Sequence, residues 1–476
     1  MPRPIILLEF NEIVPQLIER FIADGRLPHF SAFRNGSDVF TSQADEPEAP
    51  YLEPWIQWYS VHTGLPFKQH GVFRLTDGLR QDHDDVWRIL ARHGQRIMNL
   101  SSMNARPFGE HDGSVYLPDP WCSAAAPHPA ELLDFHKFVA RMVQEYTNTS
   151  ASVHQAALRF IAFMTSHGLS LTTVRALSTQ LFGEKLGKSR EPWQRASLLD
   201  AMLFDVFRHY YKQRLPDFAT FFVNSTAHYQ HAYWRDMDPA LFGDEAIGES
   251  PKKNAILFGY QCMDRLLGEL MRLAEETGAL LILSSALSQQ PYLDPNNVKG
   301  RAYYRFHEIG EFLRSIGVTW TSIDPVMTNQ YRVHFNSDDE AVVAAEKLAR
   351  LTWEGRQVVQ AMHDHQRQLY LGIGIHDAVP DDARLSLPDS NRDRPFYDLL
   401  YKIDVSKSGR HHPDGVLWFR TGRFHRHEAK PSILDILPTL LDLRGIDRSA
   451  SAHLPGKSLA PLLSTPVTEE TARKAA

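Results

Sequence analysis

The sequence predicts an α/β fold with a mostly parallel central sheet and a helical insertion. Ile5–Phe10 is an apolar run of strand length, typical of a strand that is buried on both faces of a parallel sheet. Further runs of this kind alternate with helical patterns, which is the order expected of βαβ units. Between residues 130 and 215 the strand signal disappears and helical patterns replace it. These observations define the predicted architecture.

The predicted elements follow in order from this first strand. A helical pattern covers Pro15–Ala23, and the later elements are a helix at 84–93, strands at 96–100 and 219–223, a helix at 254–276 and a strand at 279–284. In the helix at 254–276 apolar residues recur at i, i+3 and i+4 spacing, so one side of it would pack on the sheet. A strand at 415–420 and a helix at 433–443 complete the pattern.

This order predicts a discontinuous core domain with two insertions. The core takes in residues 1–130, 216–300 and 400–465. Residues 131–215 form the helical insertion or cap, and residues 301–399 form a second insertion of mixed α/β structure. Residues 466–476 are predicted to be a flexible tail.

The composition is that of an ordinary globular protein. With 476 residues, 43% of them hydrophobic and 23% charged, the chain is long enough to bury a large core. A formal net charge of -6 and a pI near 6.4 provide no basic field, so we do not expect long nucleic acid as a partner. No apolar stretch is long enough to span a membrane. The sequence does not define an oligomeric state.

The cysteines and the N-terminus indicate a cytoplasmic protein. Cys122 and Cys262 are far apart and form no CxxC pair, which fits a reducing compartment and excludes a disulfide scaffold or a cysteine zinc site. The first apolar run is followed at once by Glu9 and Glu12 and has no small-residue cleavage site, so it is not a signal peptide.

Four separated segments resemble a known family. They are IILLEFNE with GRLPHFSAF, YSVHTGLPFKQHGV, NSTAHYQHAYWR, and HHPDGVLW with SILDILPTLLDLRGI. In this order they resemble the alkaline phosphatase superfamily, and in particular its nucleotide pyrophosphatase/phosphodiesterase (type I phosphodiesterase) branch. The resemblance implies a three-layer sandwich. It also implies metal-dependent hydrolysis or transfer of phosphate or sulfate esters, with two metal ions about 4 Å apart that activate a Thr, Ser or modified Cys nucleophile.

The chain departs from the family pattern at one of the two metal sites. The resemblance places Asn11 at the first-strand aspartate, Pro54 at the nucleophile, and Ala286 and Leu287 at an Asp-His pair. Proline offers no nucleophilic atom, and alanine and leucine offer no ligand. We therefore expect this metal site to be empty.

The other metal site of the family is partly retained. The resemblance assigns it His228 and His411, whereas Asn224 stands where the family has an aspartate. A neutral amide removes negative charge that helps to hold a dication, so a carboxylate such as Glu53 or Glu9 would have to complete the site. We expect one zinc-like divalent ion at most, bound by His228, His411 and Asn224.

Further polar residues near these motifs are candidates for the site. Glu9 lies in the apolar run, where a carboxylate is costly unless it is paired or functional, and Asn11 points to the same side of the strand. Asn11 could instead cap the next helix. Glu53 precedes a proline in an aromatic-rich stretch, PYLEPWIQWYS, that could be packing alone. We expect Glu53, His228 and His231 to be catalytic residues.

The anion-binding candidates are less specific. Arg235 and His231 could bind an anion, or pair with the acidic stretch that contains Asp236 and Asp238. His412 is the neighbouring alternative to His411. Together with Glu9, Asn11 and Asn224, these residues predict a cleft for a small anionic or glycan ligand.

Two functions fit these residues. The first is a divergent phosphodiesterase or phosphatase-like enzyme that acts on a phosphate- or sulfate-type ester, or transfers such a group, with Glu53 or a histidine as general base. The second is a binding or regulatory pseudoenzyme that holds a phosphorylated or glycan ligand without cleaving it. Loss of the nucleophile favours the second function, whereas the concentration of polar residues at the cleft favours the first.

Overall fold

The described residues of this computed structural model fall into two compact units. The core unit comprises Met1–Ala140, Val153–Pro291 and Gly409–Ala476, and the second unit comprises Arg141–Ser152 and Tyr292–Ser408. The predicted tail, residues 466–476, lies outside the described residues. Described are residues 2–109, 113–122, 124–144, 154–186, 190–243, 250–293, 301–327, 329–363, 366–388, 393–447, 449 and 452–464.

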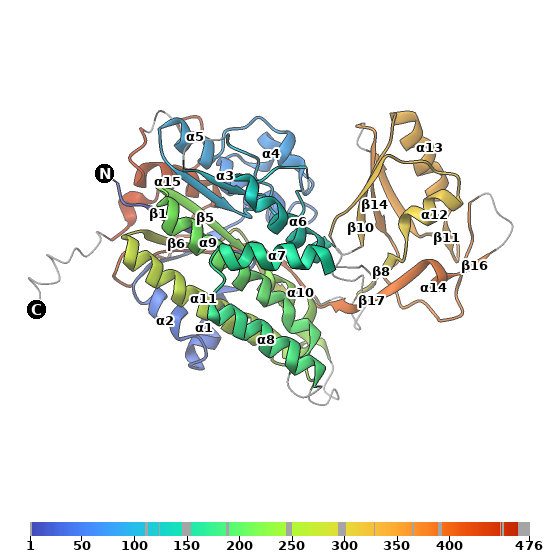
Figure 1. The fold of residues 1–476 in the computed structure, drawn as a ribbon, viewed down its shortest axis with the longest axis horizontal. Coiled ribbons are helices and arrows are strands. Elements are labelled where there is room, and N and C mark those ends of the chain that lie inside the picture. The colour runs from blue at the N-terminus through green and yellow to red at the C-terminus, as the bar shows by residue number, and fades with distance from the viewer. Residues whose placement is uncertain are drawn as a thin grey trace, which may run out of the picture. The chain divides into compact units, whose positions relative to one another are not determined.

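An eight-stranded sheet forms the centre of the core unit (Figure 1). Its order is β20 (His425–Arg426), β2 (Asp38–Gln43), β19 (Asp414–Phe419), β6 (Leu280–Ser285), β1 (Ile5–Phe10), β5 (Phe218–Val223), β3 (Ile97–Leu100) and β4 (Val115–Leu117). Only β19 runs antiparallel to both of its neighbours, β2 and β6. The predicted α/β fold with a mostly parallel central sheet is therefore confirmed.

Helices cover both faces of this sheet, which gives three layers (Figure 1). The indole of Trp87 on α5 (Val86–Arg92) donates to Thr220 of β5, while the next strand residue, Phe221, packs on Phe207 of α9 (Ala196–Arg214). Because successive strand residues point to opposite faces, α5 and α9 lie on opposite sides. The layer of α5 includes α3 (Pro54–Thr63) and α15 (Ile436–Leu443); the layer of α9 includes α2 (Pro28–Arg34), α10 (Ser225–Met237) and α11 (Ala255–Thr277).

Helices alone occupy the described part of the predicted insertion at 131–215. They are α6 (Leu133–Gln144), α7 (His154–Ser166), α8 (Leu171–Lys185) and α9. α8 packs against α9 and the short helix η3 (Pro192–Arg195). Within the part of the chain that the structure describes, no helix combines the length and the apolar composition needed to cross a bilayer.

The second unit has its own sheet and core. Its antiparallel sheet has the order β13 (Val359–His363), β14 (Gln368–Ile373), β10 (Gln330–His334) and β9 (Ser322–Pro325). The helices α12 (Ile309–Ser315) and α13 (Asp338–Ala349) contribute Phe312 and Leu348 to a core that includes Val333 and Leu369. A separate ribbon pairs β8 (Arg301–Phe306) with β17 (Leu400–Lys407). All predicted site residues belong to the core unit.

The carboxyl ends of β1, β5 and β6 bring three of the polar segments that the sequence singled out to one edge of the sheet. Asn11 follows β1, and Asn224 follows β5 as the N-cap of α10. β6 leads into β7 (Ser288–Pro291), which pairs with β18 (Gly409–His412), so that His411 faces Gln289 in the register. Since the ends of parallel strands meet at the same edge, this edge is where a site is expected.

Candidate functional site

Glu12 lies at the centre of the polar groups beyond β1. Its side chain is buried, and its backbone has φ 58, the left-handed region that non-glycine residues rarely adopt. One carboxylate oxygen, Oε1, accepts a hydrogen bond from Asn11 Nδ2 at 2.9 Å, and the other, Oε2, accepts one from Gln289 Nε2. These bonds fix the carboxylate in a buried position.

Two imidazole rings converge on the same carboxylate oxygen. Nε2 of His231, on α10, lies 3.0 Å from Glu12 Oε2, and Nε2 of His411, on β18, lies 3.4 Å from it. Ligand atoms of all three residues lie within 4.8 Å of one another. We refer to Glu12, His231 and His411 as the Glu12 cluster.

The other nitrogen of each ring faces a group that can only accept. Nδ1 of His231 lies 3.2 Å from the carbonyl oxygen of Gly409, and Nδ1 of His411 lies 3.5 Å from Glu53 Oε2. A carbonyl or a carboxylate therefore favours a proton on each Nδ1. Each Nε2 then faces the Glu12 carboxylate in one of two ways: with a second proton, as in the charged ring, or with a lone pair that a bound cation would occupy.

The Glu12 carboxyl is ionised at neutral pH. Burial alone would raise its pKa, but the charges of His231 and His411 and their hydrogen bonds outweigh burial and hold the pKa well below the usual range. The cluster thus contains a buried negative charge that the two imidazole rings offset when they are protonated.

A chain of side-chain hydrogen bonds orients this carboxylate. Trp58 Nε1, from α3, donates to Asn11 Oδ1 at 2.8 Å, which leaves the Asn11 amide nitrogen to donate. That nitrogen donates to Glu12 Oε1 and, at 2.7 Å, to Asn224 Oδ1. Because the indole is only a donor, it fixes which end of the Asn11 amide faces the carboxylate.

We expect Trp58→Phe to loosen this chain. The substitution keeps an aromatic ring but leaves the Asn11 oxygen without its buried donor, which costs about 1–3 kcal/mol of unfolding free energy. An Asn11 amide that is free to turn would also orient Glu12 less well, and losses of such outer contacts weaken metal binding by about 10–100-fold. Urea unfolding and a zinc titration measure both effects; unchanged values for both would show that the indole bond does not position Glu12.

Asp200 anchors the helix that carries His228 and His231. Its carboxylate, on α9, accepts from Ser225 Oγ and from the backbone amides of Asn224 and Ser225 at the start of α10. Burial raises the pKa of Asp200 to about 6, although the hydrogen bonds from Ser225 and Asn224 act in the opposite direction. An acidic group at a helix N-terminus also interacts favourably with the helix dipole. This contact holds α10 against the sheet edge.

His228 lies one turn before His231 on α10. Burial, and secondly the charge of His231, lowers the pKa of His228 to about 4, so that the ring is uncharged at neutral pH. An uncharged imidazole can accept a proton or donate its N–H hydrogen bond.

The structure places the other predicted site residues as follows. Glu53 precedes α3 and lies against His411, and Pro54 is the first residue of α3. Glu9 is buried in β1, where its Oε1 lies 2.8 Å from Nε2 of His62. Arg235 lies over the ring of Phe242, with 5.1 Å to the centroid.

The neighbour of His411 contacts a turn instead of the cluster. Nδ1 of His412 accepts from the backbone amide of Asp414 at 3.1 Å. The described contacts thus connect Asn11, Asn224, Glu53, His231 and His411 around Glu12, and they connect Glu9, Arg235 and His412 to other groups.

Glu12 and Gln289 are the residues that the sequence reasoning missed. The available signal was a second carboxylate directly after a buried strand, one position beyond Asn11. Nothing in the sequence around Gln289 marks it, because its role depends on the pairing of β7 with β18.

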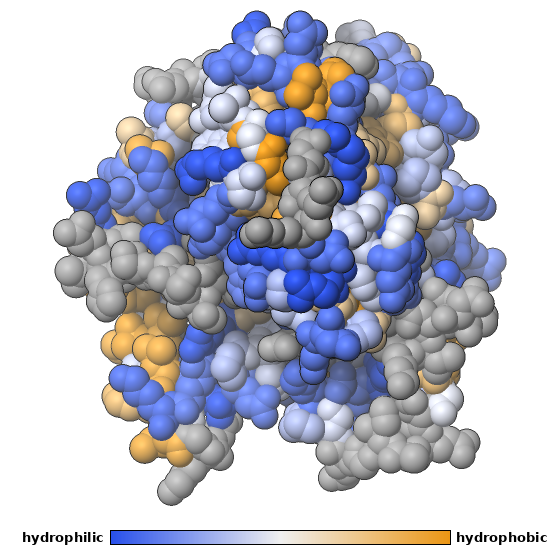
Figure 2. Space-filling model, turned by 90° about the vertical axis from the view of Figure 1, so that its right-hand side faces the viewer, coloured by the Kyte–Doolittle hydropathy of each residue, from blue (hydrophilic) through white to orange (hydrophobic). Residues whose placement is uncertain are grey.

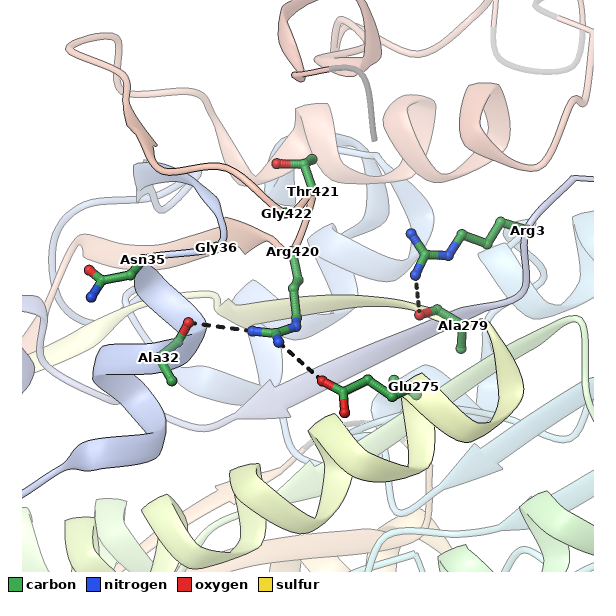
Figure 3. Close-up of a pocket in the computed structure, with 10 residues that line it drawn as sticks. Arg3, Ala32, Asn35, Gly36, Glu275, Ala279, Arg420, Thr421 and Gly422 are labelled. Atoms are coloured by element: carbon green, nitrogen blue, oxygen red, sulfur yellow. Dashed lines mark hydrogen bonds and ion pairs between the residues drawn. The ribbon is translucent and has the colours of Figure 1, made fainter. Parts of the chain in front are cut away.

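A separate cavity of about 330 Å³ lies at the opposite edge of the sheet (Figure 3). It contains Arg3, before β1, and Arg420, after β19. Arg3 donates to the carbonyl oxygens of Gly278 and Ala279, and Arg420 donates to that of Ala32 and to Glu275. The two guanidinium groups therefore satisfy carbonyl oxygens at the C-terminal ends of α2 and α11. β1 lies between this cavity and Glu12, and its length is roughly 20 Å.

Comparison with known proteins gives matches in structure only. No protein-family model matches the chain, and no curated protein matches it. Solved structures of alkaline phosphatase superfamily members are similar to this chain at low identity and modest TM-score.

Three of these structures illustrate the level of likeness. Phosphonoacetate hydrolase from Sinorhizobium meliloti 1021 in complex with phosphonoformate has 12% identity and a TM-score of 0.41, over 92% of this chain and 94% of that one. The murine ectonucleotide pyrophosphatase/phosphodiesterase 5 has 11% identity and a TM-score of 0.41, over 97% and 100%. The wild-type alkaline phosphatase PafA has 14% identity and a TM-score of 0.40, over 94% and 97%.

Proposed function

We propose that the Glu12 cluster holds one zinc-like divalent cation and that the protein acts there on a phosphate- or sulfate-type ester, by hydrolysis or by transfer of the group. The observation that carries the proposal is the orientation of the two rings. Both direct Nε2 at Glu12 Oε2, while an oxygen atom of Gly409 lies 3.2 Å from Nδ1 of His231 and one of Glu53 lies 3.5 Å from Nδ1 of His411. Histidine ligands of zinc have this arrangement, with an oxygen acceptor behind each ring.

The donor set fits a zinc-like ion. Two imidazole nitrogens and a carboxylate oxygen are the ligand types of catalytic zinc sites, which keep a fourth position open. Ligand atoms about 2.0–2.1 Å from a tetrahedral zinc lie about 3.4 Å apart. The nitrogen–oxygen distances of 3.0 and 3.4 Å are close to that separation. Glu12 and Glu53 together supply the two negative charges that balance a dication.

The remaining residues would act on the substrate and its protons. A bound cation would act as a Lewis acid on an ester oxygen. Pro54 supplies no nucleophile, so water or a substrate hydroxyl must attack. Glu53 would accept the proton from that oxygen, and His411 Nδ1 orients the Glu53 carboxylate at 3.5 Å. His228, uncharged at neutral pH, would donate or accept a hydrogen bond at the same edge of the sheet.

Binding without turnover is the second candidate function. Pro54 begins α3 at the place of the family nucleophile, and the side chains of Ala286 and Leu287 are fully buried and apolar. These three residues support a cleft that binds a phosphorylated or glycan ligand and does not cleave it. Both functions would use the Glu12 cluster, so ligand binding alone does not separate them.

Metal analysis and a substrate panel test the proposal. Purified protein supplemented with zinc is expected to retain one equivalent, and to hydrolyse at least one of the nitrophenyl phosphodiester, monoester and sulfate substrates. His231→Ala and His411→Ala are each expected to lower both metal affinity and turnover by more than about a hundredfold. His334→Ala is the matched control, because that histidine pairs with Asp324 in the second unit.

Each result has a defined consequence. Absence of bound metal after supplementation contradicts the metal site. Stoichiometric zinc without turnover on any substrate contradicts the enzyme and supports the binding protein. Turnover that survives both histidine substitutions places the chemistry outside the Glu12 cluster.

A further inference from the structure

The helix α8 has its large apolar side chains on the outside. Leu171 is 79% exposed, Phe182 66% and Leu186, its C-cap, 68%. Leu181 and Val174 are also exposed. At 100° per residue these five positions fall on one side of the helix, so they form a continuous apolar strip that faces solvent.

The opposite side of α8, which packs against the protein, is small or polar. Its buried residues are Thr173, Gln180 and Gly183. Gln180 donates to Glu184 Oε1 within the helix and to the carbonyl oxygen of Glu191 before η3, so a polar contact contributes to holding the helix in place. A surface helix normally has the reverse pattern, with its apolar side inward. The reversal indicates that something other than the described residues of the chain covers the apolar strip.

The preceding helix, α7, also has an exposed apolar side chain. Ile161 of α7 is 56% exposed. Figure 2 shows hydrophobic residues gathered at its lower left edge, on the side where α8 lies in the foreground of Figure 1. We call Ile161 and the five apolar residues of α8 and its C-cap the α8 face.

The exposed charges on α7 and α8 have one sign. Arg159, Arg175 and Lys185 are exposed on the two helices. The sequences of α7 and α8 contain one acidic residue, Glu184, and it forms an ion pair with Arg195. The face therefore presents apolar side chains among cations, with no exposed carboxylate on either helix.

We infer that the α8 face is a docking surface for a lipid membrane that carries anionic headgroups. Exposed apolar side chains would enter the boundary between headgroups and acyl chains, and the cations would lie against the headgroup charges, as in interfacial helices. A second copy of the chain fits less well. In a two-fold interface each patch meets itself, so the arginines and lysine would face one another without carboxylates.

Vesicle flotation with the full chain tests this inference. Protein is mixed with vesicles of phosphatidylcholine alone or of phosphatidylcholine with phosphatidylglycerol, and the bound fraction is measured. Binding is expected with the anionic vesicles, and it is expected to fall with added salt because screening weakens the charge contribution. Phe182→Ser combined with Leu186→Ser is expected to lower vesicle affinity by at least about tenfold. Arg175→Glu combined with Lys185→Glu is expected to lower vesicle affinity by at least about fivefold for each cation removed. A fivefold change corresponds to about 1 kcal/mol of binding free energy.

A control pair and a measurement of assembly complete the experiment. Val342→Ser with Val343→Ser removes exposed apolar side chains from α13 in the second unit and is expected to leave binding unchanged. Equal binding to neutral and anionic vesicles, or wild-type binding by the Phe182/Leu186 variant, overturns the inference. Sedimentation that shows a wild-type dimer, dissociated by the Phe182/Leu186 changes, in a protein that does not bind vesicles also overturns it and assigns the face to a second copy.

Discussion

Glu12→Gln is expected to lower zinc affinity by more than about a hundredfold. The carboxylate is the anionic member of the proposed ligand set, and both rings direct Nε2 at its Oε2 atom. Loss of an outer hydrogen-bond partner alone costs about 10–100-fold in metal affinity, so loss of a charged ligand costs more. Calorimetric titration with zinc at a fixed pH measures the change, and turnover is expected to fall with it.

The same substitution has a second effect that must be measured separately. Both Glu12 oxygens accept from amide groups, Asn11 Nδ2 and Gln289 Nε2. A glutamine has only one oxygen, so one of these donors would face another donor, and unfolding free energy is expected to fall by about 1–3 kcal/mol. Glu53→Gln is the matched comparison: it removes a charge next to His411 Nδ1 but no proposed ligand, so it is expected to weaken zinc binding less. Equal affinities for wild type and Glu12→Gln would contradict the metal site.

Five of the eight strands of the central sheet, β1, β3, β5, β6 and β19, could be predicted from sequence because their signals are local, whereas β2, β4 and β20 were not predicted. Ile5–Phe10 is the observed β1, and the helical pattern at Pro15–Ala23 is the observed α1. Apolar runs and helical periodicity mark each element within its own residues. The order of the strands is not local in this way. The antiparallel insertion of β19 between β2 and β6 depends on where the chain returns after the second unit.

The candidate site could be predicted only in part, for a related reason. His231, His411 and Asn11 stand in motifs that lie at strand ends, so their types and positions identify them. The role of Glu12 depends on a left-handed turn that aims its carboxylate between α10 and β18. No short-range sequence pattern predicts this orientation of the Glu12 side chain. The predicted roles of Asn224 and His228 as metal ligands remain predictions, and the structure adds that Asn224 Oδ1 accepts from Asn11.

Glu9 was expected to be paired or functional, but the sequence did not identify its partner. The sequence indicates that a carboxylate in a buried strand must be paired or functional. Its partner, His62, is 53 positions away at the last turn of α3. Trp58 and Trp87 lie against the His62 ring, with centroids 5.8 and 4.5 Å away. The pair is thus enclosed between the sheet and α3, on the side of β1 that also carries Asn11.

Breaking the Glu9–His62 pair is expected to destabilise the protein more than any surface change. Glu9 is 0% and His62 2% exposed, and neither Glu9 Oε2 nor His62 Nδ1 has a hydrogen-bond partner among the described residues. Either His62→Phe or Glu9→Leu leaves one polar partner buried alone, which costs about 3–5 kcal/mol. The double substitution removes both polar groups and is expected to cost less than the sum of the single changes by more than about 1 kcal/mol.

Urea unfolding of the four proteins, followed by tryptophan fluorescence, measures this coupling. The single changes are expected to lower the unfolding free energy more than the double change because of desolvation. A buried pair adds little stability over apolar residues of similar size, but either member without the other keeps its full burial cost. Additive effects of the two single changes would show that water or another group already satisfies Glu9 and His62 separately. In that case water would reach Glu9 and His62 from the sheet edge. The Glu12 carboxylate at that edge would then be less isolated from water than its burial indicates.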